Sequence, residues 1–342
     1  MKFLIAGAGA IGGYVGARLA QAGEEVTLFA RGPHLRAMQA NGLRVMSPEG
    51  NFEVRPRIIE SLSDAGPVDV IFLGVKAHGL TQLAPQLQPL IGENTTVVST
   101  QNGLPWWFFQ MEAGEFSGLR LERVDPGGVI ARAIDWRRVV ASVAYFAADV
   151  AAPGVIRHTE GNRITLGEPD GTRTERSRQI AEALIRAGFR CPVTARIRHE
   201  IWVKLLGNVA FNPISALTRA TLVQMARDPE VSILVRKIMA EVEAVAAKLG
   251  MELPVTIEQR IAGAERVGEH KTSMLQDLEA GRPMELEAVV GAVVELGERL
   301  GIPTPHTSAV YACAKLLEKT NRAQRQPSAG GAEEQALSAL GR

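Results

Sequence analysis

The sequence predicts an α/β domain built on a parallel sheet, followed by an all-α domain, and three observations lead to this expectation. A glycine-rich turn joins an apolar strand to a helix at the start of the chain. Apolar strands then alternate with helical segments, as they do in parallel sheets. From about residue 196 onward, apolar residues recur only at helical spacing. The 342 residues are long for one core, so we expect a first domain over 1–195, a helical domain over 196–322 and a largely disordered tail over 323–342.

The first strand and helix lie in the segment KFLIAGAGAIGGYVGARLAQAG, residues 2–23. We expect a strand over 3–6 and a helix over about 10–22, joined by the pattern G-x-G-x-x-G. In the Rossmann-type dinucleotide fold, the first glycine of this pattern permits a tight turn, the second lets the backbone approach a pyrophosphate, and the third lets the helix pack on the strand. The N–H groups at the helix N-terminus then face the diphosphate. The residues predicted to bind the nucleotide here are Gly7, Gly9, Ala10, Ile11 and Gly12.

The same segment has a second interpretation, because Lys2 followed by an apolar run of small residues also occurs at the start of secretory signal peptides. Five glycines and Arg18 interrupt the run, which favours the strand and helix. The composition argues against a nucleic-acid, membrane or metal partner, since 38 basic and 37 acidic residues leave a net charge of +1 and the two cysteines stand far apart. We expect a cytoplasmic protein without a metal site.

A second strand, expected over residues 26–30, completes a β-α-β unit and indicates which nicotinamide cofactor is bound. NAD usually requires an acidic residue at the end of this strand for the ribose hydroxyls, whereas NADP requires a cation for the 2′-phosphate. Here the strand ends in Ala30 and Arg31, with no acid. We therefore predict NADP(H) as the cofactor and Arg31 as the residue that binds the 2′-phosphate. The alternative is that Arg31 is a solvated residue at a strand end.

Two further strands are expected within residues 68–77 and 94–103, each an apolar run that ends in polar or glycine residues. Ligands of open α/β sheets bind at the carboxyl ends of the strands. Lys76 and Asn102 follow these two ends, so we predict that both contact the cofactor. The alternative is an exposed lysine in a loop and an ordinary Asn-Gly turn.

An aromatic-rich insertion follows over about residues 105–137, beginning with the run WWFF at 106–109. Exposed aromatic side chains in this segment would suit a homodimer interface, a lid or a wall of the substrate pocket. Residues 137–168 alternate and contain turn signals, so we expect hairpin strands that extend the first domain. A helix over about 177–187 and a short strand near Cys191 complete this domain.

The helical domain begins with the segment EIWVKLLGNVAFNPISALT, residues 200–218, which is apolar on nearly all sides and therefore predicted to be buried. Lys204, Asn208 and Asn212 follow one another at i+4 spacing and cover only about 80° of one face. A buried lysine is costly unless a partner offsets its charge, so this row indicates a site for a small polar anion. The alternative is a lysine that extends to the surface beside two asparagines in helix contacts. Pro213 is expected to kink or reset the helix.

Glu285 lies where a later helix is expected to start. The residues Gly-Arg-Pro at 281–283 mark a break and a restart, with Pro283 near the first helical position. Glu285 then falls in the first turn, where the helix dipole favours a carboxylate. From the local sequence alone, it is a residue that starts a helix. The helices expected after residue 218 cover 229–249, 254–268 and 284–300.

Together these motifs resemble those of the ketopantoate reductases (2-dehydropantoate 2-reductases), and the similarity extends from residue 1 to about 320. It is carried by the N-terminal G-x-G-x-x-G, VKA around Lys76, QNG around Asn102, the segment 200–218, and TSMLQDLEAGRPMELE at 272–287. The resemblance implies a Rossmann domain and a helical domain similar to the C-terminal domain of phosphogluconate dehydrogenase, with the active site in the cleft between them.

The resemblance also implies roles for single residues. Lys204 corresponds in position to the family's catalytic lysine. The other implied roles are a substrate carboxylate contact for Ser273, a substrate hydroxyl contact for Glu285, contacts to substrate or nicotinamide for Asn102, Asn208 and Asn212, a place near the cofactor for Lys76, and the 2′-phosphate for Arg31.

The implied reaction is the NADPH-dependent reduction of 2-dehydropantoate (ketopantoate) to (R)-pantoate, on the route to pantothenate and coenzyme A. Hydride passes to the C2 carbonyl, and Lys204 acts as the general acid. The insertion at 105–137 is longer than in shorter members of the family, which leaves another 2-oxo acid as an alternative substrate. Further alternatives are a related 2-hydroxy acid or polyol dehydrogenase, and a non-catalytic NADP-sensing protein.

Overall fold

The computed structural model describes residues 1–110 and 114–325. The chain divides into two compact units, Met1–Leu205 and Leu206–Arg342. Within the described residues, the first unit contains all the strands and the second contains only helices, which confirms the predicted α/β domain and all-α domain. The expected tail over 323–342 lies outside the described residues, except for 323–325, which end a helix.

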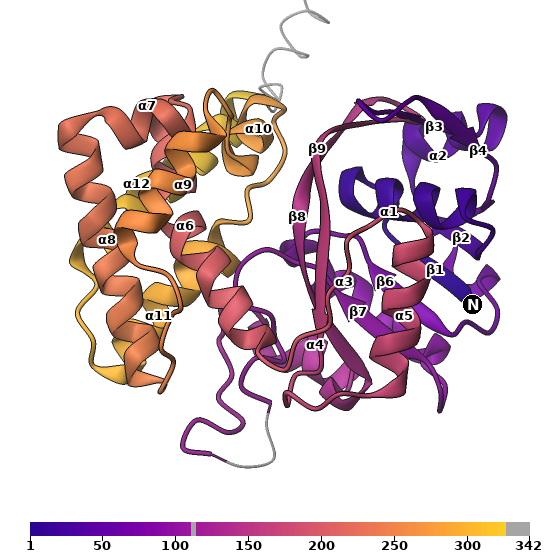
Figure 1. Ribbon diagram of the computed structural model, residues 1–342, viewed down its shortest axis with the longest axis horizontal. Coiled ribbons are helices and arrows are strands. Elements are labelled where there is room, and N and C mark those ends of the chain that lie inside the picture. Colours follow the sequence, from indigo (N-terminus) through magenta and orange to yellow (C-terminus); the bar gives the residue numbers. More distant parts are fainter. Residues whose placement is uncertain (111–113, 326–342) are drawn as a thin grey trace, which may run out of the picture. The chain divides into compact units, whose positions relative to one another are not determined.

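Strands and helices alternate along the first unit (Figure 1). The strands are β1 Lys2–Ala6, β2 Glu25–Phe29, β3 Leu43–Met46, β4 Phe52–Val54, β5 Arg57–Ile59, β6 Val70–Leu73, β7 Thr96–Ser99, β8 Val139–Ala152 and β9 Val155–Gly167. The α-helices are α1 Ala10–Gln21, α2 Gly32–Asn41, α3 Ala77–Leu87, α4 Val129–Ala133 and α5 Glu175–Arg186. Short 3₁₀ helices cover Leu62–Asp64, Gln88–Leu90, Pro126–Gly128 and Trp136–Arg138.

These strands form one sheet in the order β4-β3-β9-β8-β7-β6-β1-β2-β5. Every adjacent pair in the series β8-β7-β6-β1-β2-β5 is parallel, and so is the pair β3–β9. The pairs β8–β9 and β3–β4 are antiparallel. The register aligns five residues across β1, β2, β6, β7 and β8, namely Ala6, Phe29, Leu73, Ser99 and Ala141. They mark one carboxyl edge of the sheet, the edge at which α/β proteins bind ligands.

Helices cover both faces of this sheet. Helix α1 connects β1 to β2, and α3 connects β6 to β7 in the opposite direction along the sheet. Because such crossovers are right-handed, the two helices lie on opposite faces. Helix α5 packs against α1, and both contribute to a core with the apolar side chains of β1, β2 and β6. The strand order reverses between β1 and β6, and open α/β sheets bind their ligands at the carboxyl ends of the strands at such a point.

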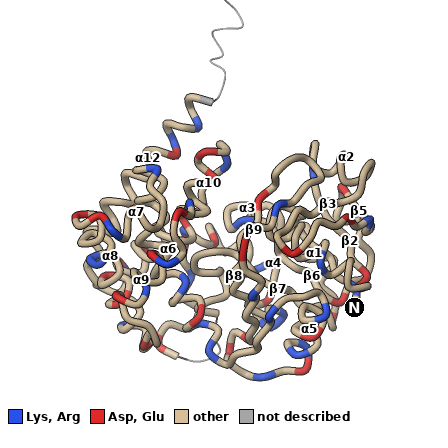
Figure 2. Tube along the Cα trace, turned by 45° about the horizontal axis from the view of Figure 1, so that its top comes forward, with Lys and Arg blue, Asp and Glu red and all other residues tan. Residues whose placement is uncertain are grey.

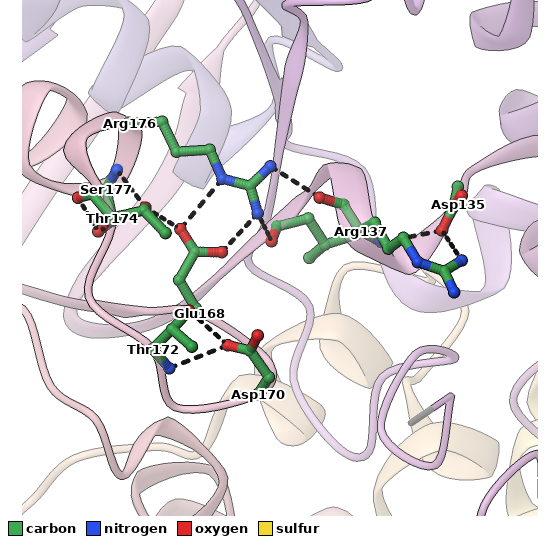
Figure 3. A network of polar contacts seen from close by, with 9 residues as sticks. Asp135, Arg137, Glu168, Asp170, Thr172, Thr174, Arg176 and Ser177 are labelled. Atoms are coloured by element: carbon green, nitrogen blue, oxygen red, sulfur yellow. Dashed lines mark hydrogen bonds and ion pairs between the residues drawn. The ribbon is translucent and has the colours of Figure 1, made fainter. Parts of the chain in front are cut away.

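The predicted hairpin is present as β8 and β9, and an ion pair between the buried Glu168 and the partly exposed Arg176 holds its two open ends together (Figure 3). Glu168, just after β9, is 2% exposed. Arg176 in α5 donates to its carboxylate through Nε at 3.0 Å, and to the carbonyls of Arg137 at 2.7 Å and Val139 at 3.3 Å. Thr174 donates to the same carboxylate. Since Arg137 and Val139 stand where β8 begins, this network fixes the start of β8 beside the end of β9.

Two expectations for the first unit are corrected by the structure. The aromatic run of the insertion is buried, with exposed fractions of 5%, 0%, 2% and 5% for Trp106, Trp107, Phe108 and Phe109. These aromatics therefore pack into the core and offer no exposed surface to a second subunit. Burying a large apolar side chain in this way stabilises a fold by about 1.5–3 kcal/mol. The strand expected near Cys191 is present only as isolated bridges from β9 to neighbouring residues.

The second unit is organised around α8 Pro229–Lys248, against which four other helices pack. Asp228 caps α8, and the carboxylate of Glu241 on α8 accepts hydrogen bonds from the backbone N–H groups of His306 and Thr307 in α12, both at 2.9 Å. The helices of this unit are α7 Leu222–Arg227, α8, α9 Ile257–Val267, α10 Ser273–Glu279, a π-helix Glu287–Gly291, α11 Ala292–Leu300 and α12 Pro305–Arg325.

Helix α6, Ile197–Thr218, contains the last residues of the first unit and the first residues of the second. It passes through Pro213 without interruption. The later helix expected from residue 284 becomes helical only at Leu286, so Glu285 immediately precedes its first turn and Pro283 lies outside it.

Basic and acidic residues are interspersed along the described chain (Figure 2), and their totals leave a net charge of +1. None of the helices in residues 1–110 and 114–325 combines the length and the apolar character that a membrane span requires.

Candidate active site

Three glycines pack backbone against backbone where β1, α1 and β6 meet. Gly7 has a φ of +106°, which favours glycine. A Cβ on Gly12 would lie 2.2 Å from the carbonyl oxygen of Gly7, and a Cβ on Gly74 would lie 2.3 Å from the same oxygen. The first and third glycines of the predicted motif therefore act in the fold itself. Sequence reasoning missed Gly74, although a glycine directly after the apolar strand β6 was a usable signal.

The middle glycine of the motif faces open space. A Cβ on Gly9 would contact nothing within 4 Å. Gly9 is the N-cap of α1, has no side chain to occupy the helix end, and is followed by no acidic residue in the first turn. The first N–H groups of a helix have no partner within it and attract anions. The loop therefore fits a diphosphate at the N–H groups of Ala10, Ile11 and Gly12.

Arg31 lies two residues past the aligned edge residue Phe29 and is the N-cap of α2. Its guanidinium lies over the ring of Phe29, with Cζ 5.1 Å from the ring centroid. The side chain is exposed and has no ion-pair partner within the described part of the chain. An exposed guanidinium with unused donors suits a phosphate group.

Lys76 and Asn102 each lie three residues past the aligned edge residue of their strands, β6 and β7, and both are half-buried. Gln101 joins the two loops, because its amide nitrogen donates to the carbonyls of Leu73 and Val75, each at 2.9 Å. Sequence reasoning missed this bridge, which places the two predicted cofactor residues at the same edge of the sheet.

Lys204 reaches the same edge from α6. Its Nζ donates a hydrogen bond to the carbonyl of Ala144 at 2.8 Å. Ala144 lies on β8 three residues past Ala141, and Asn102 lies three residues past the aligned residue of the adjacent strand. A carbonyl oxygen only accepts hydrogen bonds, so this contact orients the side-chain nitrogen with a proton on it. The half-buried lysine of the sequence motif is therefore held at the ligand edge of the sheet.

A polar group around Tyr145 supports this part of the site. The Tyr145 hydroxyl donates to Glu200 at 3.1 Å, and Arg163 forms an ion pair with Glu200 at 2.8 Å. The ring of Tyr145 lies 4.4 Å from Cζ of Arg163 and 5.8 Å from Nζ of Lys204. Sequence reasoning missed these residues, although Glu200 precedes Lys204 by one helical turn and was a usable signal.

The insertion also contacts α6. Phe108 lies against Arg198, with Cζ 5.2 Å from the ring centroid, and edge-to-face against Trp202, with centroids 6.3 Å apart. Burial lowers the pKa of Arg198 to about 10. Because Arg198 and Trp202 stand one turn apart on the part of α6 that precedes Lys204, the buried aromatic segment supports that part of the helix.

The remaining predicted residues belong to the second unit. Asn208 and Asn212 share the face of α6 that carries Lys204. Asn212 is 6% exposed. Ser273 is exposed as the first residue of α10, and Glu285 is half-buried just before the π-helix begins. These two stand at the starts of separate helices.

No group of three or more His, Cys, Asp or Glu side chains with the arrangement of a metal site occurs in residues 1–110 and 114–325.

Comparison with known proteins shows which family shares these features. Residues 3–107 match the family model described as ketopantoate reductase PanE/ApbA, and residues 196–318 match the model of its C-terminal domain.

Similar proteins carry the same description. The chain is 50% identical over 319 residues to a protein of Mesorhizobium japonicum named 2-dehydropantoate 2-reductase, covering 93% of this chain and 98% of that one. A solved PanE/ApbA family ketopantoate reductase from Ralstonia eutropha superimposes with a TM-score of 0.82 at 28% identity, over 94% and 100% of the two chains. D-mandelate dehydrogenase shares the fold at 23% identity, with a TM-score of 0.82 over 94% of this chain and 99% of that one.

Proposed function

Because the chain belongs to the ketopantoate reductase family, we propose that it reduces 2-dehydropantoate to (R)-pantoate with NADPH, on the route to pantothenate and coenzyme A. Membership makes it an oxidoreductase that uses a pyridine nucleotide and acts on a small molecule. The choice of NADPH, the identity of the substrate and the roles of single residues are parts of the proposal, and each is supported by its own contacts.

The cofactor is held along the carboxyl edge of the first unit. The diphosphate is bound by the N–H groups at the start of α1, over Gly9, where a side chain is missing. Arg31 binds the 2′-phosphate through charge-assisted hydrogen bonds. Lys76 and Asn102, joined by Gln101, lie on the next two strands and contact the cofactor near its reactive end. Residues 1–195 thus form the cofactor domain.

Lys204 is the general acid. Bound NADPH would supply the hydride that is added to the C2 carbonyl of the 2-oxo acid. Negative charge develops on the carbonyl oxygen, and the Lys204 ammonium stabilises it and gives up a proton, an effect typically worth about 10²–10⁴ in rate. The hydrogen bond to Ala144 holds Nζ in one place, so no reorganisation of this group is needed during the reaction.

The substrate contacts come from residues of the helical domain, 196–322. Asn208 and Asn212 follow Lys204 on one face of α6, and their amide groups bind the substrate or place the nicotinamide. Ser273 donates to the substrate carboxylate, and Glu285 accepts from the hydroxyl that the reaction forms. Holding the reacting carbon at a fixed distance from the ammonium lowers the entropic part of the barrier.

The single observation that carries this proposal is the place of Lys204. Its ammonium is bonded to Ala144, level with Asn102 beyond the ends of adjacent parallel strands, on the edge where the glycine-rich loop and Arg31 also lie. Hydride reduction of a carbonyl needs an acid that protonates the oxygen, and an ammonium beside a nucleotide site can supply that proton.

The test is a substrate panel. Loss of NADPH absorbance is followed with the purified protein and ketopantoate, other branched 2-oxo acids and phenylglyoxylate, each with NADPH and with NADH. The expected result is a kcat/KM for ketopantoate and NADPH above that of every other pair. Faster turnover of another 2-oxo acid would overturn the substrate assignment, and faster turnover with NADH would overturn the cofactor assignment.

A further inference from the structure

His34 connects two segments that the proposed cofactor contacts. It lies in the first turn of α2, three residues after Arg31, and is half-buried. Its Nε2 is 2.9 Å from the carbonyl oxygen of Ala8, and its Nδ1 is 2.9 Å from the backbone nitrogen of Gly154. Ala8 stands between the first two glycines of the G-x-G-x-x-G loop, so the imidazole joins that loop to the helix that follows Arg31.

The two partners determine which ring nitrogen carries the proton. The Ala8 carbonyl can only accept a hydrogen bond, so Nε2 is the protonated nitrogen that donates. The Gly154 N–H can only donate, so Nδ1 is the unprotonated nitrogen that accepts. The imidazole is therefore neutral, and both of its nitrogens form hydrogen bonds. Burial lowers the pKa of His34, which also favours the neutral form.

The backbone of Ala8 makes a second hydrogen bond. Its N–H donates to the carbonyl of Phe29 at 2.8 Å, at the end of β2 and two residues before Arg31. Residue Ala8 is thus bound to β2 by its N–H and to α2 by its carbonyl. Because Arg31 lies between these two anchors in the chain, its distance from the glycine-rich loop depends on both of them.

The other side of the ring is supported by the turn between β8 and β9. Gly154 has a φ of +77°, and a Cβ at this position would lie 3.1 Å from Cβ of Ala37 on α2. The Gly154 carbonyl accepts from the N–H of Arg44 at 2.9 Å. The turn therefore packs directly on α2 and presents its N–H group to Nδ1 of His34.

We propose that His34 is a positioning residue that fixes the separation between the diphosphate loop and Arg31, and thereby sets the preference for the 2′-phosphorylated cofactor. This inference rests on the proposed binding of NADPH. A nucleotide with a 2′-phosphate must meet the loop and Arg31 at the same time, whereas NADH lacks that phosphate. Loosening the link between the two segments therefore lowers the affinity for NADPH more than the affinity for NADH.

The test separates the two hydrogen bonds of the ring. In H34Q the side-chain amide nitrogen takes the place of Nε2 and keeps the bond to Ala8. In H34N the side-chain oxygen takes the place of Nδ1 and keeps only the bond to Gly154, and H34L keeps neither. The dissociation constants of NADPH and NADH are measured for each protein by titration calorimetry, with the melting temperature as a parallel readout.

We expect H34N and H34L to lower the ratio of NADPH to NADH affinity by about fivefold, the effect of one lost hydrogen bond, and H34Q to keep the wild-type ratio. H34N and H34Q each retain one of the two hydrogen bonds. If His34 had a purely structural role, the melting temperature and the nucleotide affinity would therefore change in parallel in these two variants. An unchanged ratio in H34L, or equal effects of H34N and H34Q on it, would overturn the inference. A wild-type protein without a preference for NADPH would overturn the cofactor assignment itself, and this inference with it.

Discussion

The three glycines of the N-terminal motif have different physical roles, and single alanine substitutions separate them. In Gly12→Ala the new Cβ would lie 2.2 Å from the carbonyl oxygen of Gly7 and 3.0 Å from Cα of Gly74. Both contacts are to backbone, so α1 and β1 must move apart. Overpacking of this kind costs about 1–3 kcal/mol, and we expect the upper end because no flexible side chain can yield.

Gly9→Ala is the matched control. Its Cβ would contact nothing within 4 Å, and a φ of −72° suits alanine, so no strain is expected. The substitution removes freedom from the unfolded chain, which stabilises a protein by about 0.4–1 kcal/mol. The methyl group does, however, occupy the space into which a diphosphate must come. Losing hydrogen bonds to a charged group weakens binding by about 10- to 100-fold.

Calorimetric melting without nucleotide and titration with NADPH measure both effects. At about 2–4 °C per kcal/mol for a domain of this size, Gly12→Ala is expected to melt about 6–12 °C below the wild type. Gly9→Ala is expected to melt at or above the wild-type temperature and to bind NADPH poorly. A Gly12→Ala protein with wild-type melting, or a Gly9→Ala protein that binds NADPH normally, would refute this division of roles.

Three further predictions follow from single side chains. Arg31→Gln is expected to weaken NADPH binding by about 10- to 100-fold and to leave the NADH dissociation constant unchanged, measured by titration calorimetry; equal weakening of both would exclude a 2′-phosphate contact. Burial lowers the pKa of His34 and of His199, so the unfolded chain binds more protons than the native one below pH 6.5. The free energy of unfolding should fall as the pH drops through that value and level off below the native pKa values, and denaturant titrations that show no such fall would contradict this. Burial also raises the pKa of the Cys191 thiol to about 12, whereas Cys313 is exposed; iodoacetamide at about pH 8 should therefore modify only Cys313 in the native protein, and mass spectrometry that finds Cys191 labelled would contradict its burial.

Local sequence patterns were sufficient for the β-α-β start of the chain and for the helical second unit. The strand and helix around Gly7, Gly9 and Gly12 were predictable because both the apolar period and the turn chemistry lie within about 20 residues. Gly74 was not found, because its partner is the carbonyl of Gly7, in the loop that follows another strand. The His34 bridge was missed for the same reason, since Ala8 and Gly154 approach each other only in the folded sheet.

The aromatic run at 106–109 shows where composition misleads. Four adjacent aromatic residues in a long insertion suggested an exposed surface, but Trp107 bonds to Ser99 at 2.9 Å and Phe108 packs against α6. The i+4 row of Lys204, Asn208 and Asn212 was read correctly as one face of a helix. That the ammonium reaches Ala144 depends on the register between β7 and β8, which a single sequence does not contain.

Lys204 is proposed as the acid in a carbonyl reduction, and its role is tested by kcat for ketopantoate at saturating NADPH in Lys204→Gln. Glutamine keeps a polar N–H group on a side chain one atom shorter than lysine, but has no acidic proton to give. We expect kcat to fall by about 10²–10⁴ while the dissociation constant of NADPH stays at the wild-type value. A Lys204→Gln protein that binds NADPH normally and reduces ketopantoate at the wild-type rate would contradict the claim.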